Sequence, residues 1–245
     1  MIDTHCHLLF GLDDGPRSPA ETLSLARQQV AVGVTHVVCT PHFSRTFPTS
    51  LETARERLAA TRELLIGAGI PLELGLAAEL SPGTSVSEPI QTLTERAIAG
   101  RFALVEMEPD TPAAFAAAVT ERLRAEGLGV VLAHPERSRG VQRTSEPLDG
   151  ARAAGALVQV VAPSLAGRWG GGVASTAWEL LERARVDLIA SDAHRARSQP
   201  SLPNARRLVL DRYGESEWRR LTTEAPAAIT AGRRPDADTA LPPAE

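Results

Sequence analysis

Short runs of β-branched and apolar residues recur along the chain, and stretches with helical periodicity separate them. Uninterrupted apolar runs of this length are typical of parallel strands that are buried on both faces. The runs predict seven strands, at Met1–His5, Val34–Thr40, Leu72–Ala77, Phe102–Met107, Gly129–Ala133, Ala156–Val161 and Val186–Ala190. Their alternation with helices predicts an α/β fold built on a parallel sheet.

Apolar residues spaced three and four positions apart predict the intervening helices. The patterns over Leu51–Ala68 and Ala113–Glu126 are each followed directly by glycine, the residue that commonly ends a helix. Strand and helix alternate without a Pro-, Ser- or Gly-rich linker. We therefore expect a single domain over residues 1–232 and a disordered tail over residues 233–245.

The charge balance argues against polyanionic partners. The 245 residues contain 26 basic and 30 acidic side chains, and the net charge is −4. Tight binding of nucleic acid or of an anionic membrane needs a basic field, so neither partner is expected. Every basic residue is Arg, which excludes Schiff-base chemistry and the phosphate-binding Lys of a Walker loop.

The same sequence favours a cytoplasmic protein without membrane insertion. Its two cysteines, Cys6 and Cys39, are too few for a disulfide framework. The first residues, Met1–His5, lack the basic and then apolar pattern of a signal peptide. The apolar runs fall well short of the roughly 20 residues that span a bilayer.

Possible metal ligands gather at one kind of position, at or just beyond the carboxyl end of a strand. They are His5, His7, His42, Glu79, Glu106, His134, Asp192 and His194. Each residue alone is explained equally well as a hydrogen-bonded polar group, a helix cap or a salt-bridge partner. The joint pattern favours a metal site, because five of the six histidines share this position. His36, which lies inside a strand, is interpreted as structural.

This pattern also bears on the architecture. In an open sheet, six neighbouring strand ends would spread over roughly 25 Å, which is too far for one cluster. A (β/α) barrel brings the ends together around one mouth. We therefore predict a barrel, with an open doubly wound sheet as the alternative. Imidazole and carboxylate donors suit Zn²⁺, Mn²⁺ or Fe²⁺, and eight ligands imply two or three divalent ions and a hydrolytic reaction.

Several motifs carry a family resemblance. They are His5-Cys6-His7, Asp13-Asp14-Gly15-Pro16, Thr40-Pro41-His42, His134-Pro135-Glu136-Arg137 and Ser191-Asp192-Ala193-His194. Over about residues 1–232 the chain resembles the polymerase and histidinol phosphatase (PHP) superfamily. Within that superfamily it is similar to the bacterial manganese-dependent protein-tyrosine phosphatases of capsule and exopolysaccharide loci. The resemblance implies a distorted (β/α)7 TIM-like barrel of PHP type, with all eight residues ligating a trinuclear site.

The resemblance also implies an activity. It is hydrolysis of phosphomonoesters by a metal-bound hydroxide, with phosphotyrosine in a bacterial tyrosine kinase that controls polysaccharide synthesis or export as the expected substrate. Mn²⁺ is the expected metal, and Zn²⁺ and Fe²⁺ stay open. Arg137 is implied as a phosphate-binding residue, because its planar fork can hold two phosphate oxygens. Asp14 is implied in positioning or proton transfer, and the sequence does not separate it from Asp13.

Two positions depart from the subfamily pattern. Arg195 stands where the subfamily usually has Asn, and Gln199 stands where it has an Arg that binds substrate. Arg195 and Arg197 are the candidates to replace that Arg. Ala225 replaces an Asn in the late Glu-Asn-Pro element, a change that bears on helix packing more than on chemistry.

Alternatives stay open at this point. The same chemistry could act on a small metabolite such as a sugar or amino-alcohol phosphate, or the barrel could be a catalytically silent regulatory module. Cys39 and Arg45 have the C-x5-R spacing of thiol-based tyrosine phosphatases. Pro41 and the lack of glycine between them argue against that phosphate loop, which needs backbone N–H donors. The oligomeric state is not predicted.

Overall fold

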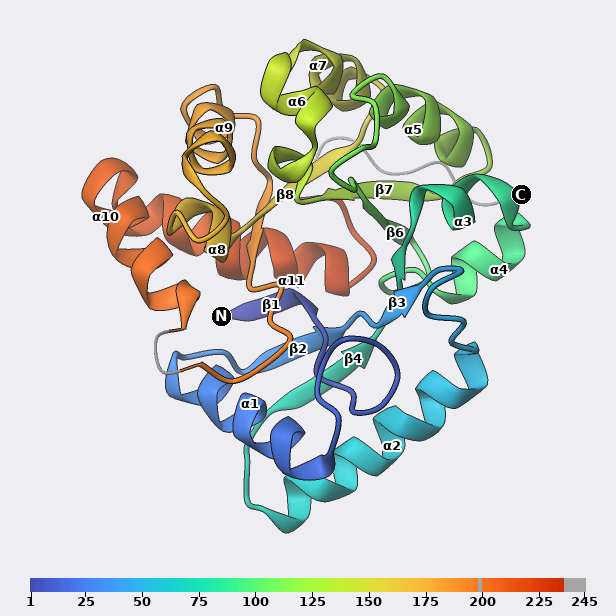
Figure 1. Cartoon of the computed structure of the whole chain (residues 1–245), viewed down its shortest axis with the longest axis vertical. Coiled ribbons are helices and arrows are strands. Elements are labelled where there is room, and N and C mark those ends of the chain that lie inside the picture. Colours follow the sequence, from blue (N-terminus) through green and yellow to red (C-terminus); the bar gives the residue numbers. More distant parts are fainter. Residues whose placement is uncertain (198–199, 236–245) are drawn as a thin grey trace.

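The protein is seen here as a computed structural model that describes residues 1–197 and 200–235. Strands occupy the centre, and the helices surround them (Figure 1). The strands are β1 (Ile2–Cys6), β2 (His36–Cys39), β3 (His42–Phe43), β4 (Glu73–Leu76), β5 (Glu79–Leu80), β6 (Phe102–Glu106), β7 (Gly129–Ala133), β8 (Leu157–Val161) and β9 (Leu188–Ala190). The seven predicted strands all form. The sequence missed the two-residue strands β3 and β5.

These strands form two parallel sheets, and the chain passes twice from the first sheet to the second without an intervening helix. One sheet has the order β1-β2-β4, and the other has the order β3-β5-β6-β7-β8-β9. After a break at Thr40–Pro41 the chain passes from β2 into β3, and after Ala77–Ala78 it passes from β4 into β5. The breaks distort the barrel and change the direction of two chain segments that carry candidate ligands.

The barrel closes between its first and last strands. Cys6 at the end of β1 forms a parallel bridge with Ala193, which follows β9. The backbone N–H of His7 donates to the Ala193 carbonyl at 3.0 Å, and that of Asp192 donates to the His5 carbonyl at 2.9 Å. The predicted distorted barrel is confirmed, and the open doubly wound sheet is wrong.

The helices form the outer layer. They are α1 (Pro19–Ala31), α2 (Leu51–Gly67), α3 (Pro82–Ser87), α4 (Ile90–Glu95), α5 (Phe115–Ala125), the 3₁₀ turn η1 (Pro135–Arg137), α6 (Arg139–Arg143), α7 (Glu146–Ala153), α8 (Ala162–Leu165), α9 (Gly171–Glu182), α10 (Ser201–Arg219), the π-helical turn η2 (Arg220–Glu224) and α11 (Ala225–Thr230). Serine caps begin α1 and α2: Ser18 accepts from the Glu21 N–H, and Ser50 accepts from the Thr53 N–H.

Strand alternation divides the core in two. Val105 and Val130 face the helices, whereas Leu104 and Val131 pack inside the barrel with Ala225 and Ile229 of α11. Ala225 is thus a packing residue, as the sequence indicated. Because side chains two apart share a strand face, Glu106 points into the barrel mouth above Leu104. Alternation therefore aims the polar residues at strand ends into one space.

Among the described residues, no helix is both long and apolar enough to cross a membrane. The first part of the expected tail contacts the barrel, since Arg234 Nη1 donates to the Gly155 carbonyl at 2.6 Å. Residues 236–245 of that tail lie outside the described residues.

Candidate metal centre

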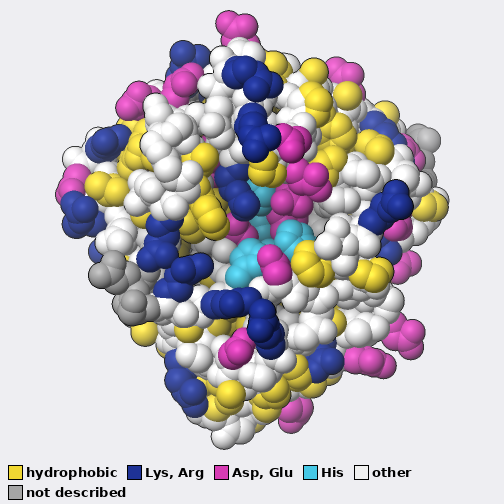
Figure 2. Space-filling view, in the orientation of Figure 1, with side chains coloured by type: hydrophobic (Ala, Val, Ile, Leu, Met, Phe, Trp, Pro, Cys, Tyr) yellow, Lys and Arg dark blue, Asp and Glu magenta, His cyan; other side chains and the backbone are white. Residues whose placement is uncertain are grey.

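All eight predicted ligands meet at the carboxyl mouth of the barrel. Donor atoms within 4.8 Å of one another form four overlapping groups in the described part of the chain: His5–His7–Glu79, His5–His134–Asp192, His42–Glu79–Glu106 and His7–Asp14–His42–His194. Figure 2 shows the histidines grouped in the centre of one face, with acidic and basic side chains around them. The structure brings the set together, and its role as a set of ligands stays a prediction.

Glu79 is at the centre of this cluster. Its Oε2 lies 3.2 Å from Nε2 of both His5 and His7 and 3.1 Å from Nδ1 of His42. Its Oε1 lies 2.8 Å from Nε2 of His134. The side chain is 1% exposed. One buried carboxylate thus contacts four imidazoles, an arrangement that suits cation binding.

The histidine tautomers test whether cations fit here. The His5 Nδ1–H donates to Gln159 Oε1 at 2.9 Å, and the His7 Nδ1–H donates to Asp13 Oδ2 at 2.7 Å, because both oxygens can only accept. Each Nε2 is then the atom that binds either a proton or a metal, and the two Nε2 atoms are 3.4 Å apart. Lone pairs that converge beside a carboxylate repel each other unless a cation lies between them, so the donor set fits divalent metals.

The carboxylates indicate the same need for positive charge. Burial and the negative charge of Glu79 raise the pKa of Glu106 to about 8. Burial alone would lower the pKa of His5, but the charges of Glu79 and Asp192 outweigh it and raise that pKa to about 9. Acidic groups this close stay ionised together only when positive charge lies among them.

Two of the candidate ligands have unusual backbones. His134, directly after β7, has φ 37°, and Asp192, just after β9, has φ 49°; both are left-handed. Such conformations cost energy and persist where the surroundings hold them in place. At Asp192 the restraint is Asp3, whose carboxylate accepts from the Ser191 N–H at 3.0 Å and from Gln29 Nε2 at 2.9 Å. Asp3 thereby fixes the turn that presents Asp192.

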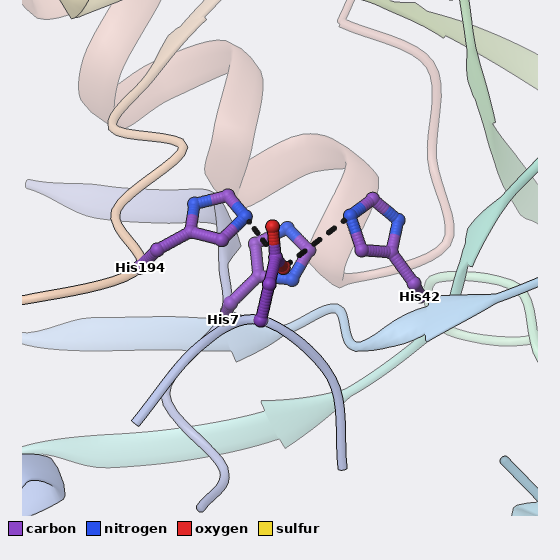
Figure 3. A group of neighbouring side chains, drawn as sticks. His7, His42 and His194 are labelled. Atoms are coloured by element: carbon purple, nitrogen blue, oxygen red, sulfur yellow. Dashed lines mark ion pairs between the residues drawn. The ribbon is translucent and has the colours of Figure 1, made fainter. Parts of the chain in front are cut away.

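The structure separates the two neighbouring aspartates that the sequence could not. Asp13 is 1% exposed and accepts from His7, from the Gly15 N–H and from the His42 N–H. Asp14 is 53% exposed, and its Oδ1 lies 3.2 Å from His194 Nε2 and 3.7 Å from His42 Nε2. In Figure 3 the rings of His7, His42 and His194 converge. Asp13 therefore orients a ligand, whereas Asp14 faces the pocket.

Glycine is required in this turn. A Cβ on Gly15 would lie 2.6 Å from the His7 carbonyl oxygen, closer than any side chain can approach. The Asp-Asp-Gly-Pro sequence can therefore fold back against β1 and place Asp13 beside His7. The hydrogen bond from His194 also lowers the pKa of Asp14 to about 2, so this carboxylate is ionised.

Arg137 lies at the rim of the cluster. Its Nη1 donates to Asp192 Oδ2 at 3.1 Å, and its side chain is 25% exposed. The turn η1, which starts directly after His134 and ends at Arg137, brings it here. The remaining N–H groups of its guanidinium can reach an anion in the mouth. Its placement thus agrees with the predicted phosphate contact, and it also supports a candidate ligand.

A pocket of about 530 Å³ opens over the cluster. Its wall includes Arg137, Arg168, Arg195 and Arg197 together with Trp169. The backbone of Arg197 is held by Gln28 on α1, whose amide donates to the Arg197 carbonyl and accepts from its N–H at 3.1 Å. Gln199, the position of the missing arginine, lies outside the described residues.

Cys39 is excluded as a nucleophile. It is fully buried on β2, and burial raises the pKa of its thiol. A protonated thiol without a path to solvent cannot attack phosphorus. His36, interpreted as structural from the sequence, stands apart from the cluster beside Glu73.

Sequence reasoning missed three residues of the site. Asp3 carried a usable signal, because a carboxylate in a predicted buried strand needs partners. Gln159 lies in the middle of β8, two residues after the inward-facing Leu157, so the strand pattern could have placed it inside the barrel. Trp169 lies outside every predicted element and carried no comparable signal.

A closed parallel barrel with imidazole and carboxylate donors at its carboxyl mouth defines the class of TIM-barrel-like metal-dependent hydrolases. Within that class, the family model for capsular polysaccharide synthesis, CpsB/CapC, matches residues 1–231. The chain belongs to the CpsB/CapC family. This result confirms the resemblance drawn from the sequence.

Individual proteins agree with this assignment. The tyrosine-protein phosphatase YwqE of Bacillus subtilis is 28% identical over 232 residues, which cover 91% of this chain and 89% of YwqE. The tyrosine-protein phosphatase CpsB of Streptococcus pneumoniae is 26% identical over 241 residues, which cover 94% and 98%.

Solved structures agree as well. A structure from the work on YwqE and CpsB, described as unique metal-dependent tyrosine phosphatases, superposes with a TM-score of 0.86, 26% identity and 95% coverage of both chains. Histidinol phosphate phosphatase from Lactococcus lactis shares the fold at 12% identity, with a TM-score of 0.56 and coverage of 87% of this chain and 93% of that one.

Proposed function

We propose that this chain is a metal-dependent phosphatase that hydrolyses phosphotyrosine in a protein. The observation that carries the proposal is the convergence of eight imidazole and carboxylate side chains beside Arg137, at the floor of a 530 Å³ pocket. Membership of the CpsB/CapC family supports it, since the relatives YwqE and CpsB bear the name tyrosine-protein phosphatase.

The cluster would hold two or three divalent ions, and Mn²⁺ is the proposed metal. Such ions, when bound, lower the pKa of water towards about 7 and neutralise the charge on phosphate oxygens. Gln159 and Asp13 keep the Nε2 atoms of His5 and His7 free to bind them. Glu79 would help to hold the ions, because its two oxygens contact different histidines.

The other residues would act on the substrate. Arg137 orients the phosphate by charge-assisted hydrogen bonds, and its contact with Asp192 holds the guanidinium in place. Asp14 lines the pocket as an ionised carboxylate with its Oδ1 3.2 Å from His194 Nε2, and its proposed role is positioning or proton transfer. Ser191 also lines the pocket, but its hydroxyl donates to Asp3. We therefore propose that water attacks the phosphorus directly and that no covalent phosphoenzyme forms.

The proposed partner is a bacterial tyrosine kinase that controls polysaccharide synthesis or export, and the proposed location is the cytoplasm. The family supports the pathway, and two unpaired, buried cysteines are compatible with a reducing compartment. Arg168, Arg195 and Arg197 give the pocket mouth a positive edge that suits an anionic phosphopeptide.

Reconstitution tests the proposal. The purified protein is stripped with a chelator and reloaded with Mn²⁺, Zn²⁺ or Fe²⁺, and phosphate release is measured from a phosphotyrosyl peptide, a phosphoseryl peptide and sugar phosphates. We expect Mn²⁺ to restore turnover of the phosphotyrosyl peptide in the parent protein, with the matched variant Asp192→Asn inactive. Faster turnover of sugar phosphates would favour the metabolite alternative, and no turnover with any ion would indicate a silent module.

A further inference from the structure

Trp169 is an exposed indole on the wall of the catalytic pocket. Among the described residues, the large hydrophobic side chains that stand out from the surface are Ile66, Val86 and Trp169, and Trp169 is 49% exposed. Of these three, only Trp169 lines the pocket over the metal cluster. An aromatic ring left open to water inside a binding pocket is a surface that a ligand can cover.

The backbone presents this ring from a defined turn between α8 and α9. Gly167 with φ 75° and Gly170 with φ 95° flank it, and both angles lie in the region that glycine adopts without strain. The Gly167 N–H donates to the Ser164 carbonyl at 3.0 Å, and the Arg168 N–H donates to the Pro163 carbonyl at 2.9 Å. The turn is thus tied to the end of α8, and the position of the indole is set by the fold.

Arg137 connects this ring to the metal cluster. Its guanidinium carbon lies 5.0 Å from the centroid of the Trp169 ring, and its Nη1 lies 3.1 Å from Asp192 Oδ2. The guanidinium therefore contacts an aromatic ring and a candidate ligand at the same time. A phosphate bound by Arg137 and the cluster would have its organic group within reach of the indole.

The pocket wall is suited to a flat ring. Pro163 and Leu202 line the same pocket as Trp169, so apolar surface adjoins the arginine that would bind the phosphate. A phenyl ring gains contact area against an indole or a proline, and aromatic pairs are stabilised beyond what their buried area gives. The methylene of a phosphoserine is too small for this contact.

We propose that Trp169 is a specificity-determining residue that contacts the aromatic ring of the substrate and favours aryl over alkyl phosphomonoesters. This inference rests on the proposed function and adds to it the residue that selects the ester. The proposal gives the two residues of this pocket different roles. Arg137 binds the phosphate, which every phosphomonoester has, and Trp169 recognises the organic group to which the phosphate is attached.

The test compares Trp169→Leu and Trp169→Phe in the manganese-loaded protein. The kcat/KM is measured on one peptide that carries either phosphotyrosine or phosphoserine at the same position. We expect Trp169→Leu to lose about tenfold on phosphotyrosine, chiefly through KM, and less than about twofold on phosphoserine, whereas Trp169→Phe keeps most of the parent selectivity. Trp178→Leu is the matched control, because Trp178 also packs against an arginine, Arg212, away from the pocket.

Two outcomes overturn the inference. An equal loss on both peptides would mean that Trp169 only positions Arg137, and no loss on either would mean that the ring does not contact substrate. A binding measurement tests the role of Trp169 independently of the proposed phosphatase activity. Calorimetry compares peptides that carry a non-hydrolysable aryl phosphonate or alkyl phosphonate, with no turnover needed. An aryl preference that Trp169→Leu removes supports the inference even if phosphotyrosine is not hydrolysed, and no aryl preference in the parent contradicts it.

Discussion

Asp13 accepts a 2.7 Å hydrogen bond from Nδ1 of His7, and so it determines which nitrogen of that ring faces the metal cluster. Asp14, the next residue, faces the pocket instead. Two adjacent carboxylates therefore have different tasks, and substitution separates them.

We expect Asp13→Asn to weaken metal binding by about 10- to 100-fold, because partners of this kind fix the orientation and basicity of a ligating imidazole. Asp14→Asn is the matched comparison: it leaves the three histidines of its donor group in place, so it should lower kcat with a smaller loss of metal. Metal content after dialysis against a weak chelator, measured beside kcat, checks both. If Asp14→Asn loses its metal and Asp13→Asn does not, the two assignments are reversed.

Changes to the candidate ligands at His134 and Asp192 should abolish turnover without unfolding the barrel. Asp192→Asn and His134→Asn are the suitable variants, because both positions are left-handed and Asn tolerates that conformation better than Ala does. Far-UV circular dichroism should stay close to that of the parent, and metal content should fall. Parent-like activity in either variant would contradict the metal assignment.

Replacement of Arg137 should reduce phosphate binding. Loss of a charge-assisted contact in Arg137→Ala costs about 1.5–3 kcal/mol, or roughly ten- to a hundredfold in kcat/KM. Arg137→Lys keeps the charge without the planar fork and should recover only part of that loss. Because Arg137 also contacts Asp192, metal content is measured on both variants. Parent-like kcat/KM in Arg137→Ala would rule out the phosphate contact.

The thiol of Cys39 should be dispensable and unreactive. Cys39→Ala is expected to keep a sizeable fraction of the parent activity, because the buried thiol has no path to phosphorus. Burial also raises the pKa of this thiol, so iodoacetamide at pH 8 should label it only after denaturation. Mass spectrometry of the alkylated protein gives the result. Complete inactivation of Cys39→Ala with its metal retained would reopen a cysteine mechanism.

Metal removal should lower the stability of the whole barrel. The cluster joins β1, β3, β5, β6 and β7 to the segment after β9, so cations that bind only the folded chain stabilise all of these together. At a free metal concentration 100 times Kd, the gain is about 2.7 kcal/mol for one site. Thermal unfolding with and without chelator measures it. A Tm that does not respond to metal would show that the cluster binds no ion in the folded state.

The sequence predicted the barrel and the convergence of eight polar side chains at its mouth because both follow from simple rules. Apolar runs marked the strands, and polar residues at their carboxyl ends marked the mouth. The sequence did not predict the contacts of Asp3 with Ser191 and of Gln159 with His5, because they join residues more than 150 positions apart. Such pairings depend on how the barrel closes, which local periodicity does not report. The different roles of Asp13 and Asp14 depend in turn on one tight approach at Gly15.

The seam between Cys6 and Ala193 has a consequence for biosynthesis. These residues are 187 positions apart, yet they close the barrel and bring His5 beside Asp192. During translation His5 and His7 leave the ribosome early, and their counterparts Asp192 and His194 follow only after most of the chain has been made. The nascent chain therefore has an incomplete cluster for most of its synthesis. A metal ion that needs the complete cluster can therefore bind only at the last stage, when the first strand meets the last.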